Sequence, residues 1–456
     1  MSKESRPKPL NAEIFYDLRD QSYWYRLNGR YVKMKKTDLK MHLRVMGYND
    51  DFIKTGEGSL PQIDYPFFEA TRNRAIDYAG ALAGHRTGIY RDGAGRSFLV
   101  TDEARGVWED IPRGKIIVPE FFAEFLEELF PDDQSRRFCY WLSIALQSLK
   151  EGDFSPGQAV VLAGPPKCGK SFLQDMVTEI LGGRSANPFK YMMELTQFNN
   201  DLVSSEHWKI EDPPASIDIR TRRDFGNNIK NCTFTRDFPV HAKGKDQLCL
   251  PLFRRVTISV NDELENLSLI PPLEPSINDK LMLFHCGTAV KSLEQFRGNK
   301  NAPTLPGMTE QSSGEKVSRK LAWWKFLEEV PTIRTWLLRA FRKVPREWLD
   351  DRCGVAYYHH PDIQEALCSL APEHRLLQLI DYVYFDTPPL VQLTDRKAYD
   401  LETELQAKAP MQTGAISRHM NWCGNYLGRL IRDKNPRISK RKVDGYTLWT
   451  IKPPSN

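Results

Sequence analysis

The sequence of 456 residues lacks the features of secreted, zinc-stabilised and membrane proteins. Its eight cysteines are scattered with no C-x-x-C pair, so they indicate neither a disulfide framework nor a structural zinc site. No run of about 18 apolar residues occurs, and the opening MSKESRPKPLNAEIF has no apolar signal-peptide core. We therefore expect a soluble cytoplasmic protein with no membrane partner.

A strong charge of either sign is also missing. The chain has 64 Lys and Arg against 59 Asp and Glu, a formal net charge of +5. Any nucleic-acid partner must therefore be argued from where the basic residues lie. The hydrophobic content of 41% and charged content of 27% are ordinary for a globular protein. There is no internal repeat and no low-complexity tract.

The pattern along the chain predicts an α/β fold in several parts. Strand-like and helix-like pieces alternate over 155–295, whereas 299–318 is polar and rich in Pro, Gly and Ser. We expect a small α+β domain over 1–118, a helical collar segment over 119–150, an α/β core over 151–298, a linker over 299–318, a helical extension over 319–386 and a compact module over 390–456.

Turn and cap residues predict local structure in the first hundred residues. Asn28-Gly29 sits between YWYRL and RYVKM and favours a type I′ hairpin over 23–34. Thr37 is the expected N-cap of a helix that Gly47 closes, and 88–100 is expected to form a second hairpin.

Residues 159–174, AVVLAGPPKCGKSFLQ, contain the spacing G-x-x-x-x-G-K-[ST] between a strand-like run and an amphipathic helix. Backbone N–H groups of such a loop point at phosphate oxygens, Lys170 reaches the β/γ-phosphates and Ser171 ligates Mg²⁺. A glycine-rich turn without a ligand is the alternative. We expect ATP to be bound by Gly164, Pro165, Pro166, Lys167, Cys168, Gly169, Lys170, Ser171 and Phe172.

Acidic and amide side chains downstream complete an expected catalytic set. Glu211 and Asp212 follow HWKI, where carboxylates would hold Mg²⁺, through Asp212, and orient the attacking water. A surface acidic pair before a Pro-Pro turn is the alternative interpretation. The strand FRRVTISVND reaches Asn261, well placed for the γ-phosphate or the lytic water.

Two strand-like arms in FPVHAKGKDQLCL (238–250) flank a basic turn. Lysines at a hairpin tip can contact backbone phosphates without reading sequence. The sequence predicts a basic hairpin tip at Lys243 and Lys245, with His241 nearby, and a solvated surface turn is the alternative.

This order of motifs resembles the superfamily 3 helicases, which are AAA+ motors of phages, plasmids and small DNA viruses. LPLFRRVTISVNDE followed by PPLEPSINDK is also similar to the helicase part of phage-type primase-helicase proteins. The resemblance covers about 120–295 and extends more weakly to about 385. It implies that Glu211 and Asp212 are Walker B and that Asn261 is the sensor. It also implies that His241, Lys243 and Lys245 contact DNA from hairpins in the central pore of a hexamer.

The chain departs from the family pattern in one respect. Many members carry an arginine finger after the sensor, but no arginine occurs between Asn261 and Arg297. Arg254 and Arg255 are the candidates for a charge supplied in trans, which contributes strongly to phosphoryl transfer. Candidates for a role in cis are Arg222, Arg223 and Arg236.

The last module resembles a winged helix domain. Thr394 is the expected cap of a helix through DRKAYDLETELQA, a second helix is expected over 416–432, and RISKRKV-DG-YTLWTIK predicts a hairpin. A protein-binding winged helix is the alternative to duplex binding. We expect DNA contacts from Arg429, Arg432, Lys440, Arg441 and Lys442.

Together these features predict an ATP- and Mg²⁺-dependent, homo-oligomeric DNA helicase that moves on single-stranded DNA during replication of a phage, plasmid or other mobile element. The first 118 residues show no strand-borne D-x-D or D-x-E pair, so we expect no polymerase activity and allow for a separate primase or polymerase partner. An ATP-gated, origin-binding initiator that does not unwind DNA is the main alternative. A P-loop kinase or a non-helicase AAA+ remodeller is another.

Overall fold

The computed structural model describes residues 13–55, 58–212, 219–235, 237–240, 248–287, 314–386, 390–417, 420–432 and 434–454. Internal contacts divide the chain into two compact units. Unit 1 contains Met1–Pro213, Asn227–Val260 and Asp279–Tyr358, and unit 2 contains Pro214–Gly226, Asn261–Asn278 and His359–Asn456. No helix within the described ranges is long and apolar enough to cross a membrane. The domain boundaries expected from the sequence remain predictions.

The N-terminal part of unit 1 is a small α+β assembly. A four-stranded sheet has the order β3-β2-β1-β6, and the helices α1 and α2 bury Leu39, Leu43 and Phe67 in its cluster. The expected hairpin is confirmed, with Asn28 and Gly29 at positive φ. The bounds are β1 Ile14–Asp17, β2 Ser22–Leu27, β3 Arg30–Met34, α1 Lys36–Val45, β4 Phe52–Thr55, β5 Gly58–Pro61, η1 Gln62–Asp64, α2 Tyr65–Asn73 and β6 Ala75–Ile76.

The cap expected at Thr37 is wrong. Helix α1 begins one residue earlier, at Lys36, and its N-cap is Lys35 in an extended conformation. Gly47, with a φ of 97°, does close the helix as expected. The second expected hairpin is confirmed as β8 Gly88–Arg91 paired antiparallel with β9 Ser97–Val100, next to β7 Tyr78–Gly80.

A five-stranded sheet forms the centre of unit 1, in the order β11-β12-β15-β10-β16. The pairs β11–β12, β12–β15 and β10–β16 are parallel. Every residue of β10 is buried, as its continuous apolar run predicts for an interior strand. The bounds are β10 Ala159–Gly164, β11 Ser185–Ala186, β12 His207–Glu211, β15 Arg255–Asn261 and β16 Leu281–His285.

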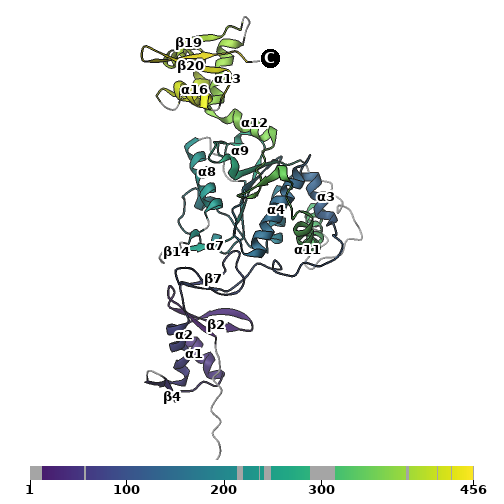
Figure 1. Ribbon diagram of the computed structural model, residues 1–456, viewed down its shortest axis with the longest axis vertical. Helices are drawn as coiled ribbons and strands as arrows, with labels where there is room; N and C mark the ends of the chain where they lie inside the picture. The colour runs from purple at the N-terminus through teal and green to yellow at the C-terminus, as the bar shows by residue number, and fades with distance from the viewer. Residues whose placement is uncertain are drawn as a thin grey trace, which may run out of the picture. The chain divides into compact units, whose positions relative to one another are not determined.

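Helices α3 Glu120–Leu129, α4 Gln134–Glu151 and α11 Gly314–Ala340 lie side by side next to this sheet (Figure 1). Their apolar faces share one cluster with the strand residues and with α5 Lys170–Ile180, including Trp141, Leu162, Met176 and Phe326. The Trp141 indole N–H donates to the Gln158 carbonyl at 3.0 Å, which satisfies its polar end inside the cluster. Residues 119–150 are therefore part of the same core as the sheet.

The remaining elements before the last module lie in unit 1 and, for α9 and the first half of α8, in unit 2. A small hairpin of β17 and β18 lies inside the region 319–386 that was expected to be helical. The bounds are α6 Phe189–Met192, α7 Asn200–Val203, α8 Ile219–Phe234, β13 Asp237–Val240, β14 Leu248–Pro251, α9 Leu264–Leu267, η2 Asn278–Lys280, η3 Arg346–Trp348, β17 Leu349–Asp350 and β18 Gly354–Val355.

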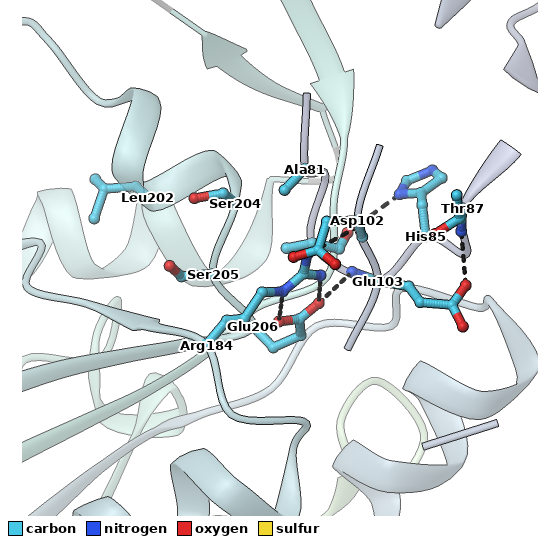
Figure 2. A network of polar contacts seen from close by, with 12 residues as sticks. Ala81, His85, Thr87, Asp102, Glu103, Arg184, Leu202, Ser204, Ser205 and Glu206 are labelled. Carbon is cyan, nitrogen blue, oxygen red and sulfur yellow. Dashed lines mark hydrogen bonds and ion pairs between the residues drawn. The ribbon is translucent and has the colours of Figure 1, made fainter. Parts of the chain in front are cut away.

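A buried ion pair fixes the chain that leads from the N-terminal part into the sheet (Figure 2). Glu206 is fully buried and pairs with Arg184, which donates from Nε at 2.9 Å. The same carboxylate accepts the Gly84 N–H at 3.0 Å, and Arg184 also donates to the Asp102 carbonyl at 3.0 Å. One charge pair therefore ties two connecting segments to the edge of the sheet.

Most of the C-terminal part of unit 2 packs around a three-stranded sheet in the order β19-β21-β20. Leu401, Leu405, Leu427 and Leu430 are fully buried in one cluster with side chains from these strands and from α13. The bounds are α12 Pro361–Leu370, α13 Pro372–Ile380, η4 Asp381–Phe385, β19 Leu393–Lys397, α14 Ala398–Lys408, α15 Pro410–Ile416, α16 Trp422–Arg432, β20 Ile438–Val443 and β21 Tyr446–Ile451.

Three expectations for this module meet different outcomes. The hairpin is confirmed, since β20 and β21 pair antiparallel around Asp444 and Gly445, both at positive φ. The cap at Thr394 is wrong, because this residue lies within β19 and α14 begins only at Ala398. The helix expected over 416–432 begins at Trp422, after the separate short helix α15.

Candidate nucleotide site and basic surface

The loop expected to hold phosphate lies between β10 and α5. Gly164 ends the strand, and a Cβ added to it would lie 2.5 Å from the Cys286 carbonyl oxygen, so glycine is required for this close approach. Gly169 has a φ of 112° and Lys167 a φ of 64°, and both turn the backbone through the left-handed region. The N-cap of α5 is Gly169, which has no side chain to cap the helix start. The first N–H groups of α5 are suited to an anion.

Lys170 is folded onto this loop. Its ammonium nitrogen donates to the carbonyl oxygens of Gly164 at 2.7 Å and Pro165 at 2.8 Å, and the residue is 6% exposed. Phosphate oxygens are stronger acceptors for an ammonium group than backbone carbonyl oxygens are. The geometry therefore fits a polyphosphate chain that would take over the ammonium group.

Cys168 contributes a third polar group to the inside of the loop. Its sulfur lies 3.8 Å from the Lys170 ammonium nitrogen, and the residue is 1% exposed. A hydrogen bond from the Cys286 thiol, with the Lys170 charge and backbone N–H, lowers the pKa of Cys168 to about 6, although burial opposes this. The sequence carried no signal that Cys286 would lie here.

The acidic pair ends the strand that is tied to the helix of the loop. Gln174 of α5 donates to the Ile210 carbonyl at 3.2 Å and to the Thr257 hydroxyl at 2.9 Å. Glu211 is the last residue of β12, and Asp212 follows with a φ of 35°. The structure therefore holds the strand end that carries both carboxylates against the helix that begins at Lys170.

Lys209 forms a bridge between the same two elements. Its ammonium nitrogen lies 2.7 Å from an Asp175 carboxylate oxygen on α5 and 3.1 Å from one of Glu211. Burial alone would lower the pKa of Lys209, but hydrogen bonds and charges from Asp175 and Glu211 raise it instead. Gln174, Asp175 and Lys209 were not singled out from the sequence, because pairing across a strand and a helix is visible only after folding.

The other expected catalytic positions meet different outcomes. Asn261 is the half-buried last residue of β15, two residues beyond Ser259, which pairs in register with Glu211. Ser171 is half-buried and Phe172 is buried at the start of α5. Pro165 is half-buried, whereas Pro166 and Lys167 are exposed at the tip of the loop. No described contact tests the roles expected of Asn261 and Ser171.

Arg254 and Arg255 do not suit the role in trans that the sequence suggested. Arg254 is 6% exposed and donates to the backbone carbonyls of Cys232, Thr235 and Leu252. Arg255 is 2% exposed and donates to the Ser155 carbonyl at 3.2 Å. Burial lowers the pKa of each guanidinium to about 10. Both side chains are therefore buried inside the protein, which does not suit a charge supplied to another subunit.

Register places Arg255 even further from the expected chemistry. It pairs with His207 at the first position of β12, while Ser259 pairs with Glu211 at the last. Arg255 is thus at the opposite edge of the sheet from the acidic pair. Among the candidates for a role in cis, Arg222 donates to the Ile270 carbonyl at 3.1 Å and Arg223 donates to Glu274 at 2.8 Å. Arg236 lies outside the described residues.

The two arms of the expected basic hairpin are present as β13 and β14. They pair antiparallel from Asp237↔Pro251 to Val240↔Leu248, and Phe238 and Leu250 are buried. The tip residues His241, Lys243 and Lys245 lie outside the described residues. Their role in DNA binding stays a prediction.

The five cations expected to contact DNA in the last module differ in their environment. Arg432, Lys440 and Lys442 are exposed, on α16 and β20. Arg429 lies 3.5 Å from a Glu373 carboxylate oxygen, and Arg441 pairs with Asp395. Arg437, which was not among the expected contacts, pairs with Asp381. Acidic neighbours thus already balance some of this charge.

No protein-family model matches the chain, and a search of curated proteins finds no match. Among solved structures, the chain is similar to two apo structures of the C-terminal region of NrS-1. In one, 97% of this chain covers 96% of the other at a TM-score of 0.55 and 13% identity. The match to the second structure covers 99% of this chain and 100% of the other, at a TM-score of 0.54 and 13% identity. An active helicase, SCCmec type IV Cch, matches at a TM-score of 0.40 and 9% identity, which is too low to compare folds. The chain therefore has the fold of the NrS-1 C-terminal region over almost its whole length.

Proposed function

We propose that this protein is an ATP-dependent DNA helicase. The observation that carries the proposal is the loop between β10 and α5, where Lys170 is folded onto carbonyl oxygens at a helix start whose N-cap is Gly169. The strand end that bears Glu211 and Asp212 is held against the same helix through Gln174 and Lys209. Phosphoryl transfer to water needs this combination of a cation, backbone donors and carboxylates.

The residues present fit Mg²⁺ and ATP. Ser171 and Asp212 would hold the metal ion, and the loop from Gly164 to Phe172 would hold the phosphates. Mg²⁺ would neutralise phosphate charge when bound, and Lys170 would position the terminal phosphates. Glu211, 42% exposed at its side chain, would orient the attacking water, and Asn261 would sense the γ-phosphate. These roles follow from the resemblance to superfamily 3 helicases.

The same resemblance supports the AAA+ assignment and a homo-oligomeric, hexameric ring that moves on single-stranded DNA in replication of a phage, plasmid or other mobile element. Lys243 and Lys245 would grip the strand inside the ring, and a separate primase or polymerase would act beside it. With Arg254 and Arg255 buried, the trans-acting cation must come from another residue.

We assign the last module to duplex DNA binding as a winged helix. Its order of strand, helices and hairpin supports this, with α16 carrying Arg432 and β20 carrying Lys440 and Lys442 at the surface. Exposed cations on a helix and an adjoining hairpin can contact the phosphates on both sides of a groove.

Strand displacement on forked DNA tests the proposal. The wild type should hydrolyse ATP and unwind the fork, and Lys170→Ala should lose both, because a phosphate contact cannot be replaced by a methyl group. Lys343→Ala removes an exposed lysine outside the loop and should behave as wild type. Absence of ATP hydrolysis in the wild type, with and without DNA, would contradict the proposed function.

The second candidate is an ATP-gated initiator that assembles on duplex DNA without unwinding it. The exposed cations of the last module favour this alternative, since duplex binding is what an initiator needs. ATP hydrolysis and duplex binding without strand displacement, over several fork designs and salt concentrations, would support the initiator over the helicase.

A further inference from the structure

Two cysteines meet beneath the phosphate loop. Cys286 follows β16, and its N–H donates to the Ala163 carbonyl at 2.7 Å, which places it beside the end of β10. A Cβ added to Gly164 would lie 2.8 Å from the Cys286 Cβ. The loop then brings Cys168 back, and its sulfur receives a hydrogen bond from the Cys286 thiol. The two side chains come from distant parts of the chain and are close enough to hydrogen-bond beside Gly164.

Cys168 is set apart from the other buried cysteines by its neighbours. The hydrogen bond from Cys286 and the charge of Lys170, whose nitrogen lies 3.8 Å from the sulfur, lower the pKa of Cys168 to about 6 and so favour the thiolate. Burial alone raises the pKa of Cys139, and it dominates in raising the pKa of Cys232 to about 12. A thiolate is the form that attacks peroxides and disulfides.

We propose that Cys168 and Cys286 form a reversible disulfide that locks the phosphate loop. The oxidant class is a hydroperoxide, of which hydrogen peroxide is small enough for a buried sulfur. The Cys168 thiolate attacks one peroxide oxygen, the O–O bond breaks, and the hydroxide released is protonated to water. The Cys286 thiol then attacks the resulting sulfenic acid, forming the S–S bond and expelling a second water. Two thiols are oxidised and one peroxide is reduced.

The disulfide would hold the loop in the conformation described above. Lys170 would stay on the Gly164 and Pro165 carbonyls, and the backbone around Cys168 would be tethered to the residue after β16. A bound nucleotide should have the opposite effect, because it draws Lys170 away from the sulfur and so reduces the thiolate fraction. This consequence for nucleotide binding rests on the proposed function, whereas formation of the disulfide does not.

Peptide mapping of the full chain under non-reducing conditions tests the pair directly. After hydrogen peroxide treatment we expect a linked peptide containing Cys168 and Cys286, which dithiothreitol removes. Cys286→Ser should abolish the link and leave a sulfenic acid at Cys168 that dimedone traps. Cys168→Ser should give neither product. Cys232→Ser, which changes an equally buried cysteine away from the pair, should leave the link unchanged.

Binding of a fluorescent ATP analogue tests whether the disulfide weakens nucleotide binding. Oxidised wild type should bind it at least about tenfold more weakly, a change of about 1.4 kcal/mol, and dithiothreitol should restore binding. Prior addition of Mg²⁺ and ATP should slow formation of the linked peptide. No linked peptide in the wild type, with Cys168 untouched by dimedone, would overturn the redox pair even if nucleotide binds. A linked peptide in a protein that binds no nucleotide would instead overturn the proposed function and leave the pair intact.

Discussion

At the scale of single residues, Arg184 holds a carboxylate that has no access to water. Glu206 is fully buried, and its partners are the Arg184 guanidinium and the Gly84 N–H. We expect Arg184→Met to lower the free energy of unfolding by about 3–5 kcal/mol, because it leaves a buried charge without its cation. Chemical denaturation measures this loss, and faster amide hydrogen exchange at Gly84 locates it.

The matched control for this prediction is Arg105→Met. Arg105 is 73% exposed at its side chain and pairs with Glu179 at 3.2 Å. An exposed pair contributes about 1 kcal/mol or less. Equal losses for the two variants would show that the buried pair does not hold the connecting segments in the way described.

His207 gives unit 1 a pH dependence of its own. The ring lies between the Thr178 hydroxyl at 2.7 Å and the Thr257 hydroxyl at 2.8 Å, and burial lowers its pKa to about 3. In the unfolded chain the pKa is near its ordinary 6.5. Below pH 6.5 His207 is therefore protonated in the unfolded state but not in the folded state. The free energy of unfolding falls as the pH falls from 6.5 toward 3.

We expect this single group to contribute a slope of about 1.4 kcal/mol per pH unit below pH 6.5. His207→Gln should be less stable at neutral pH but should lose this part of the slope. Denaturation midpoints of both proteins at pH 7, 6 and 5 measure the difference. Parallel profiles would mean that His207 is protonated in the folded protein.

The residues that could be predicted were those whose role follows from local spacing. Gly164, Gly169 and Lys170 were identifiable because a phosphate loop needs them at a fixed, short spacing in the sequence. Gln174, Lys209 and Cys286 were not, since each acts through an element distant in sequence. Arg254 and Arg255 were misjudged because a charged residue beside a strand suggests exposure. Here backbone carbonyls accept from Arg254 inside the protein, whereas Nε and Nη2 of the buried Arg255 have no hydrogen-bond partner among the described residues.

At the scale of elements, local turn chemistry predicted well and capping residues predicted poorly. Asn28-Gly29 and Asp444-Gly445 both form the expected hairpins, because their positive φ angles determine the turn without help from the rest of the chain. Thr394 has the residue type of a helix cap, but it lies in β19, which pairs with β21 over Leu393↔Ile451 and Lys397↔Leu448. Pairing with β21, which is distant in sequence, therefore makes Thr394 part of a strand. The residues around Thr394 alone do not contain this information.

The surface formed by α16 and β20 allows a graded test of DNA binding. Arg432 and Lys442 are exposed, so replacing both by Ala should weaken duplex binding and reduce the salt dependence by about two counterions. Arg429→Ala with Arg437→Ala removes the same charge from residues paired with Glu373 and Asp381, and should have a smaller effect. Binding titrations at several salt concentrations measure both variants. Equal losses, with unchanged melting, would place the duplex elsewhere.

The elements also limit how this module can be removed. Leu376, Ile380 and Phe385 belong to the same buried cluster as Leu427 and Ile451. A truncation at residue 390 would strip the cover from that apolar surface and would confuse loss of DNA binding with loss of folding. Point substitutions in the full chain are therefore the sharper experiment.

At the scale of the whole molecule, the likeness to the NrS-1 C-terminal region extends over 97% of the chain at only 13% identity. A fold can persist at this identity because the spacing of buried apolar residues along helices and strands, rather than particular residues, determines which elements pack. Function does not follow from that likeness, since one fold supports many activities. The nucleotide loop and the basic residues of this chain must therefore carry the functional argument.

ATP hydrolysis and contact with single-stranded DNA are expected to depend on different residues of the chain. Replacing Lys243 and Lys245 by Ala should leave basal ATP hydrolysis unchanged, because the nucleotide contacts belong to the loop between β10 and α5. Stimulation by single-stranded DNA should fall about tenfold or more, and unwinding should be lost, because translocation needs cations that follow the phosphate backbone. Hydrolysis with and without DNA, and strand displacement, are measured on the same preparations.

Lys320→Ala with Lys343→Ala removes two exposed lysines and should retain unwinding. If the Lys243 and Lys245 variant still unwinds DNA, the basic turn does not grip the strand and the translocating element must be sought elsewhere in the chain.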